Sequence, residues 1–374
     1  MQFGLTETQQ VLKNSAREFF SAVCPIAEVR RLMETPTAYD AAQWQKMALQ
    51  GWTGIIFDEE YGGLGLGLVE MAVALEEMGR VLLPGPYLST VLAGVTIDAA
   101  GNRDQKQRFL SRISLGEARA TLALLETSAS WDPAEVQLDA RPTLEGFALN
   151  GRKMFVPDAA AADFLVCAAR SGPDLGLFIV PHDAPGLTIS PLPAIDETRK
   201  LYQVAFADVP VDEDDFLAIG DSACDALERA LALATVALAA EMVGGMQRVM
   251  ENAVEYAKAR KQFGKPIGQF QAVQHLCADM LLLTESSRSA AYYAAWAVQE
   301  RAPDAGAAVS IAKAYASEAY REVGNRGIQV QGGMGFTWEN NVHLYYKRAK
   351  ASELMFGDAT YHRERIAHLV IDKL

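Results

Sequence analysis

The hydrophobic period of the chain changes twice along its length, and this change limits the folds open to it. Apolar residues recur at helical spacing up to residue 118, short strand-like runs follow as far as residue 209, and helical spacing returns after residue 221. Helices and strands that are segregated in this way are typical of an α+β fold. We predict an N-terminal all-α domain at 1–118, a middle β-barrel domain at 119–218 and a C-terminal four-helix bundle at 219–374.

Local signals refine this outline. Thr6 and Gln9 form a capping box that predicts the start of the first helix. Asn150-Gly151 lies between two strand-like runs and predicts a β-hairpin. The expected strands cover 121–125, 146–149, 153–156, 164–169, 177–180, 187–190 and 202–209.

Composition excludes several classes of function. The chain has 374 residues with 34 Lys and Arg against 47 Asp and Glu, and the net charge of -13 argues against a nucleic-acid or anionic-membrane partner. The four cysteines include no C-x-x-C pair and the five histidines show no metal-ligand spacing, so we expect no metal. We see neither a leader peptide nor a membrane span, and we expect a cytoplasmic protein.

Residues 256–280 contain a helix, a break and a second helix. Gly264 and Pro266 interrupt helical hydrogen bonding, and the second helix is expected to begin after Gly268. One face of this helix is predicted to be buried against its neighbours through Phe270, Val273, Leu276, Cys277, Met280 and Leu281.

The break also carries a basic cluster with an aromatic ring at its centre. An anion with a flat ring would suit it, because Arg offers a fork of donors and Phe offers a ring face. The alternative is a solvated basic helix end that interacts with its own helix dipole. The cluster consists of Arg260, Lys261, Phe263 and Lys265, with Gln269 and Gln271 beside them.

The pattern R-x-x-F-G-x-P-I-x-x-F-Q at 260–271 closely resembles the acyl-CoA dehydrogenase family. The resemblance covers the whole chain and implies that Arg260 and Phe263 reach across a subunit interface to the pyrophosphate and adenine of FAD, with Gln271 in the same site. A second motif, G-I-Q-V-Q-G-G at 327–333, implies that Gln329 and the two glycines contact the adenylate. These glycines are Gly332 and Gly333, and a purely structural turn is the alternative.

Two segments of the middle domain should face the flavin ring by the same resemblance, and both depart from the family pattern. L-E-T-S-A-S-W-D replaces T-E-P-x-x-G-S-D, so that Leu125 stands at a polar position. Phe155-Val156-Pro157 replaces W-I-T, so that Pro157 removes both a hydroxyl and a backbone N–H. Leu125, Phe155 and Pro157 remain the predicted flavin-contacting residues.

The catalytic carboxylate that the family uses to remove an α-proton is missing. Phe356 occupies its usual position, and Ala234 occupies the alternative one used by some members. Glu241 lies seven residues after Ala234 on the same helix face and is the best remaining candidate, although a structural ion pair would also explain it. Glu353 and Asp358 flank the vacant position as weaker candidates, and Asp358 is also a candidate for cofactor binding.

The resemblance implies FAD-dependent α,β-dehydrogenation of an acyl-CoA thioester, with electron-transfer flavoprotein or a similar acceptor. Three hypotheses remain: a dehydrogenase with a displaced base, one subunit of a heteromeric dehydrogenase whose partner supplies the base, and a repurposed flavoprotein that performs elimination or desulfination. A non-catalytic FAD-binding partner subunit is a variant of the second. We expect a homo- or hetero-oligomer. The acyl chain is open between a fatty acid and a steroid or aromatic group.

Overall fold

A computed structural model describes residues 4–371, and the chain forms two compact units. The first unit takes in Met1–Arg30, Leu68–Leu83 and Thr235–Leu374, whereas the second takes in Arg31–Gly67 and Pro84–Ala234. Each unit is therefore built from segments that are far apart in the sequence. The three predicted domain boundaries stay a prediction, while the order of a helical region, a β region and a second helical region is confirmed.

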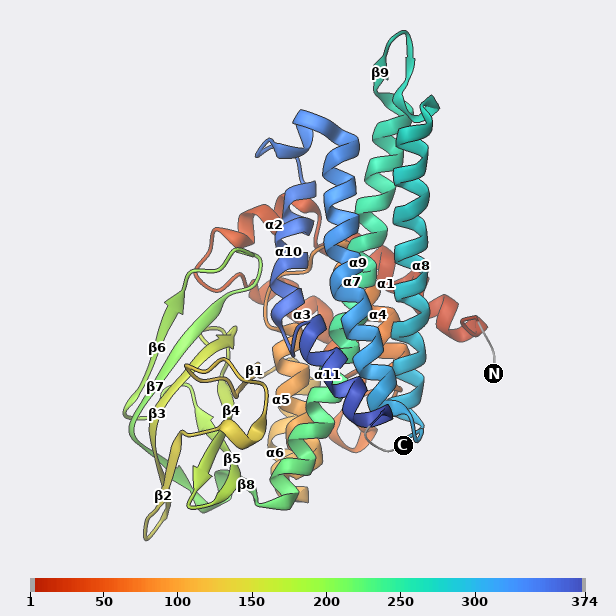
Figure 1. The fold of residues 1–374 in the computed structure, drawn as a ribbon. Coiled ribbons are helices and arrows are strands. Elements are labelled where there is room, and N and C mark those ends of the chain that lie inside the picture. Colours follow the sequence, from red (N-terminus) through yellow and green to blue (C-terminus); the bar gives the residue numbers. More distant parts are fainter. Residues whose placement is uncertain (1–3, 372–374) are drawn as a thin grey trace. The chain divides into compact units, whose positions relative to one another are not determined.

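The first unit is helical. Its long helices run side by side (Figure 1), with α9 in contact with α8, α10 and α11, and α4 in contact with α1 and α8. The predicted capping box is confirmed, because the Thr6 side chain accepts from Gln9 N and the Gln9 side chain accepts from Thr6 N. The helices are α1 (Glu7–Val23), α4 (Leu68–Arg80), α7 (Asp221–Ala259, from Thr235 onward), α8 (Gln271–Gln299), α9 (Ala305–Gln331), α10 (Val342–Leu354) and α11 (Ala359–Val370).

Helices α4 and α7 touch through their backbones at two glycines. A Cβ on Gly79 would lie 1.9 Å from the carbonyl oxygen of Glu241, and one on Gly244 would lie 1.8 Å from that of Glu76. Real side-chain carbons do not approach so closely, so only glycine permits this crossing. The crossing fixes where the side chains of α4 meet those of α7 and α8.

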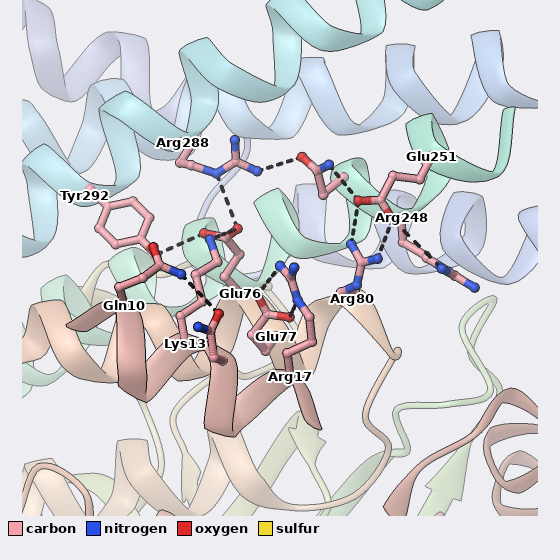
Figure 2. A network of polar contacts seen from close by, with 12 residues as sticks. Gln10, Lys13, Arg17, Glu76, Glu77, Arg80, Arg248, Glu251, Arg288 and Tyr292 are labelled. Carbon is pink, nitrogen blue, oxygen red and sulfur yellow. Dashed lines mark hydrogen bonds and ion pairs between the residues drawn. The ribbon is translucent and has the colours of Figure 1, made fainter. Parts of the chain in front are cut away.

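A network of ion pairs surrounds the crossing (Figure 2). The buried Glu76 carboxylate accepts from Lys13 at 2.8 Å and from Tyr292 at 2.9 Å, and it lies 3.3 Å from Arg288. Burial opposes its ionisation, but the charges of Arg288 and Lys13 outweigh burial and lower the pKa of Glu76. Arg17 binds the neighbouring Glu77 through two hydrogen bonds. The buried carboxylates of α4 are thus compensated by cations from α1 and α8.

The second unit holds the β sheet and the remaining helices. Its strands pair in the order β6-β7-β3-β2-β4-β5-β8, and β1 pairs with β4 in parallel. Core side chains such as Leu149, Cys167 and Phe178 are fully buried. The helices are α2 (Ile26–Met33, in part), α3 (Ala41–Leu49), α5 (Tyr87–Ala100) and α6 (Arg103–Ser114). The strands are β1 (Ala120–Ala123), β2 (Asp139–Pro142), β3 (Gly146–Pro157), β4 (Phe164–Ser171), β5 (Asp174–Pro181), β6 (Leu187–Leu192), β7 (Leu201–Asp212) and β8 (Phe216–Ile219).

The hairpin predicted at Asn150-Gly151 is wrong. Both residues lie inside the continuous strand β3, whose two halves pair with the same neighbour β7, and the register shifts between Leu149 and Gly151. The Asn150 side chain exchanges two hydrogen bonds of 2.9 Å with Asp208 on β7. Asn-Gly therefore forms a β-bulge here, and Asn150 replaces the ladder bonds that the bulge interrupts.

Among the residues that the structure describes, no helix combines the length and the apolar character needed to cross a bilayer.

Candidate functional site

The break between α7 and α8 is a two-stranded hairpin, which the sequence reading missed. Strand β9 (Lys261–Gln262) pairs with β10 (Lys265–Pro266), and Phe263 and Gly264 form the turn with φ of +52° and +79°. Positive φ at both central residues is the mark of a type I′ hairpin turn. Figure 1 shows the hairpin projecting beyond the ends of α7 and α8. The sequence signal for this turn was the Phe-Gly dipeptide between two lysines. Strands of two residues are too short to show an alternation of apolar and polar positions.

The predicted cofactor-facing side chains of this hairpin point outward. The Phe263 ring is 92% exposed and forms a T-shaped pair with Phe270, with the ring centroids 6.1 Å apart. Lys265 Nζ lies 4.4 Å from the centroid of the Phe270 ring. Arg260 and Gln271 are also exposed. A solvated large aromatic ring beside several cations offers a stacking face and anion donors to a ligand or a second chain.

The buried face predicted for the start of α8 is only partly present. Met280 is buried as expected, whereas Leu281 is 48% exposed. The buried stripe of the helix instead runs through Met280, Thr284, Ser287 and Ala291. Leu281 is therefore turned away from the packed neighbours α4 and α9, and the prediction for it is wrong in the single chain.

The second predicted adenylate motif ends helix α9. Gln329 lies exposed on the last turn, and Gly332 ends the helix with a φ of +60°. Gly332 and Gly333 are exposed, and a Cβ on either would meet nothing within 4 Å. Helix α9 ends at the same end of the bundle at which α8 begins, as Figure 1 shows. An open glycine backbone of this kind lets a phosphate or ring approach the main chain closely.

The predicted flavin-facing residues of the second unit lie together. Met154 N donates to the carbonyl of Leu125 at 2.8 Å, which holds the segment after β1 against β3. Phe155 lies next in β3, has a φ of +54° and is 41% exposed. The carbonyl of Pro157 accepts from the Thr121 hydroxyl at 2.6 Å. The structure therefore brings Leu125 and Phe155 together and anchors Pro157 to β1.

A buried ion pair behind this segment was not predicted. Lys153 has no exposed side-chain area and donates to Glu126 at 2.7 Å and to the carbonyl of Leu124 at 2.9 Å. Burial lowers the pKa of Lys153. For Glu126, burial opposes ionisation, but Lys153 and the backbone N–H groups of Gln137 and Leu138 lower its pKa. A lysine directly before the apolar run 154–156 was the available signal. The pair fixes the backbone of 124–126.

Glu241, the best candidate base from the sequence, forms a buried ion pair. Glu241 is buried on α7 and forms an ion pair with Arg348 of α10, which is itself buried. Arg348 also lies 3.5 Å from the carbonyl of Leu83. The sequence reading allowed such a structural pair as the alternative role of Glu241, and the pair is present. A base role for Glu241 stays a prediction.

The other carboxylates near the vacant position also have partners. Glu353 binds Arg321 and lies 2.7 Å from Lys350. Asp358 accepts from Tyr361 N at 2.8 Å and is the N-cap of α11. Phe356 is buried between α10 and α11 with a φ of +58°. The cap explains Asp358 as a helix-starting residue, and its predicted cofactor contact stays a prediction.

These features fit one half of a dinucleotide site on the first unit. Among residues 4–371, the Arg260 guanidinium has no ion-pair partner, the Phe263 ring is solvated, and the Gly332-Gly333 backbone has open space before it. The acidic chain thus keeps uncompensated donors where the sequence predicted a pyrophosphate and an adenine.

Comparison with known proteins identifies the family of the chain. Family models described as the acyl-CoA dehydrogenase N-terminal, middle and C-terminal domains match residues 6–117, 121–209 and 224–371. The probable acyl-CoA dehydrogenase YngJ of Bacillus subtilis (strain 168) is 30% identical over 384 residues, which cover 99% of this chain and 100% of that protein.

Solved structures are similar over the full length. The ChsE4-ChsE5 complex from Mycobacterium tuberculosis matches with a TM-score of 0.90 and 28% identity over 100% of this chain and 99% of that one. PigA with FAD and proline matches with a TM-score of 0.93 and 26% identity over 100% of both chains. With the three domain matches and the full-length relative, the chain belongs to the acyl-CoA dehydrogenase family.

Proposed function

We propose that this chain is the FAD-binding subunit of a heteromeric acyl-CoA dehydrogenase and that a homologous partner subunit supplies the catalytic base. The observation that carries the proposal is the buried Phe356 at the position of the family base, together with the ion pair that engages Glu241. Phenylalanine cannot accept a proton. The Glu241 carboxylate is already engaged by the buried Arg348 guanidinium.

The reaction removes a proton from the α-carbon and a hydride from the β-carbon of an acyl-CoA thioester, and bound FAD supplies the hydride acceptor. The chain's own residues bind and orient the cofactor in this proposal. Arg260 and Phe263 would hold the pyrophosphate and adenine of a neighbouring subunit's cofactor, and the Gly332-Gly333 backbone would face the adenylate. Leu125 and Phe155 would provide an apolar wall for the flavin ring. The ChsE4-ChsE5 structure, a complex of two named chains, supports the heteromeric form.

The same proposal explains the exposed apolar side chains of the first unit. Leu281, Leu282 and Trp296 of α8 are exposed in the single chain, as is Phe263 at the hairpin. A homologous subunit packed on α8 would cover them, since interfaces of stable complexes are rich in such residues. The electron acceptor in this proposal is electron-transfer flavoprotein or a similar protein, and the acyl group is a fatty acid or a ring-containing chain.

The test compares flavin reduction by saturated acyl-CoA in the isolated chain and in its complex with a co-expressed homologous subunit. We expect the isolated chain to be slower by about 10²–10⁴-fold, the usual contribution of a general base. Phe356→Glu should restore part of the rate to the isolated chain, whereas the nearly isosteric Phe356→Gln should not. Full activity of the isolated wild-type chain would contradict the proposal and favour a displaced base.

A further inference from the structure

Two buried basic side chains hold the turn between α10 and α11. Lys313 on α9 donates from Nζ to the carbonyl oxygens of Glu353 at 3.0 Å and of Gly357 at 2.7 Å. His362 on α11 donates from Nε2 to the carbonyl oxygen of Phe356 at 2.9 Å. Three carbonyls within residues 353–357 are therefore bound by side chains that come from two other helices.

The turn needs such support because its backbone is strained. Phe356 and Gly357 have φ of +58° and +94°, and a Cβ on Gly357 would lie 2.2 Å from the Tyr361 ring. A bulky residue such as Phe disfavours positive φ, and such conformations persist only where the surroundings fix them. The contacts from Lys313 and His362 fix residue 356, since they bind its own carbonyl, that of the next residue and that of Glu353 three residues earlier.

Lys313 is unusual in having carbonyls as partners in place of a carboxylate. It is fully buried, and within the described residues no carboxylate lies at ion-pair distance from its Nζ. The titratable groups that face it are Glu353 and Asp358, together with His362, whose pKa burial lowers to about 4. Glu353 is engaged by Arg321 and Lys350, and Asp358 caps α11.

The third partner of Lys313 is a hydroxyl, Ser317 Oγ at 3.0 Å, one turn further along α9. This partner matters because burial lowers the pKa of Lys313 to about 7. A charged ammonium can donate to all three oxygens. A neutral amine can still donate to the two carbonyls and accept from the Ser317 hydroxyl. The contacts to the turn are thus compatible with either protonation state.

We propose that Lys313 is a positioning residue which, with His362, fixes the side chain at position 356 against the acyl group of the substrate. The inference rests on the proposed function where it places residue 356 at the acyl site. The hydrogen bonds from Lys313 and His362 to the turn do not depend on that function. The stabilisation of the turn and the positioning of residue 356 can therefore be tested separately.

Stabilisation of the turn by these hydrogen bonds is tested by amide hydrogen exchange of residues 355–358 in the purified holoprotein. We expect Lys313→Met to raise exchange in this turn by about tenfold or more, as the loss of two buried hydrogen bonds predicts. His362→Leu removes the other donor without changing α9 and should act in the same direction. Lys350→Met is the matched control, since it removes a lysine that contacts Glu353 only from the surface. An unchanged turn in both Lys313→Met and His362→Leu, or an equal rise in Lys350→Met, would overturn the proposal.

The positioning role is tested in the Phe356→Glu variant, where residue 356 becomes the base. Adding Lys313→Met should lower kcat by about tenfold or more with little change in the KM for acyl-CoA, because a misplaced base affects the chemical step. Adding Lys350→Met should change neither. A change in KM alone would refute positioning. If the wild-type chain is inactive with a homologous partner as well as without one, the proposed function fails, while the exchange result still decides whether Lys313 and His362 hold the turn.

Discussion

The ion pair between Glu241 and Arg348 gives Glu241 a structural role that differs from the catalytic role considered from the sequence. From the sequence, Glu241 is a carboxylate within an apolar helix and a possible base, whereas in the structure it compensates a buried arginine. We predict that Glu241→Gln destabilises the protein by about 3–5 kcal/mol, since it removes the anion beside a buried cation. Thermal or urea unfolding measures this loss.

The double variant Glu241→Gln, Arg348→Met is the control and should recover part of the lost stability, because both charges are then gone. In the heteromer, Glu241→Gln should keep α-proton exchange of the bound acyl-CoA. Loss of that exchange in a variant that is folded and still holds FAD would instead identify Glu241 as the base.

Lys313 gives the molecule a pH dependence of stability. Its pKa is lowered by burial from 10.5 to about 7 in the folded chain. Between these two values the unfolded chain binds more protons than the folded one, so stability rises with pH across this window. We predict that the unfolding free energy of the wild type, compared with Lys313→Met at each pH, increases from about pH 7 to 10. A difference that stays flat would contradict the lowered pKa of Lys313.

The burial of two lysines could not be predicted from the sequence. Lys153 directly precedes the apolar run 154–156 and Lys313 lies within the apolar run 311–314, and a lysine in such a place is usually solvated. Their partners are mainly backbone carbonyls of other segments, such as Leu124 and Gly357. Main-chain partners leave no residue-type signal, and both positions were therefore missed as parts of the site.

At the scale of elements, the crossing of α4 and α7 depends on two glycines. We predict that Gly244→Ala destabilises the protein by about 1–3 kcal/mol or more, because the new methyl group would lie 1.8 Å from a backbone oxygen of α4. Urea unfolding gives the difference. Gly306→Ala in α9 is the matched control. Its methyl group would meet only Leu369 at 3.4 Å, and it should be neutral or stabilising by about 0.4–1 kcal/mol.

Elements with strong local signals were predictable, and elements defined by distant pairing were not. The capping box located α1, and the Gly-Pro break located the ends of α7 and α8. The hairpin prediction at Asn150-Gly151 was wrong because the same dipeptide occurs in hairpin turns and in β-bulges. Only the pairing with β7, more than fifty positions later in the sequence, distinguishes the two. Strands β2 and β8, of four residues each, gave no alternation long enough to read.

At the scale of the whole molecule, the outward-facing hairpin is part of the cofactor site that we propose the subunits share. We predict that Arg260→Gln lowers the affinity for FAD by about 10–100-fold, the value of a charge-assisted hydrogen bond to phosphate. Titration of the apoprotein with FAD, followed by flavin fluorescence, measures it. Lys258→Gln, which removes a charge two residues earlier on α7, should leave the affinity unchanged. Equal losses of FAD affinity in both variants would indicate a general effect of positive charge and not a direct contact between Arg260 and the phosphate.

The discontinuous first unit constrains how the protein is made on the ribosome. Helix α4 leaves the ribosome early with two buried carboxylates, but Arg288 and Tyr292, which compensate Glu76, are translated more than two hundred residues later. At about 5–20 residues per second, the nascent helix waits roughly ten to forty seconds for α8. The glycine face of α4 lacks its native neighbours until α7 has been made, and the acidic side chains lack theirs on α8 for the whole interval. We therefore expect the nascent chain to depend on chaperones until α8 has emerged, while the second unit, complete by Ala234, can fold first.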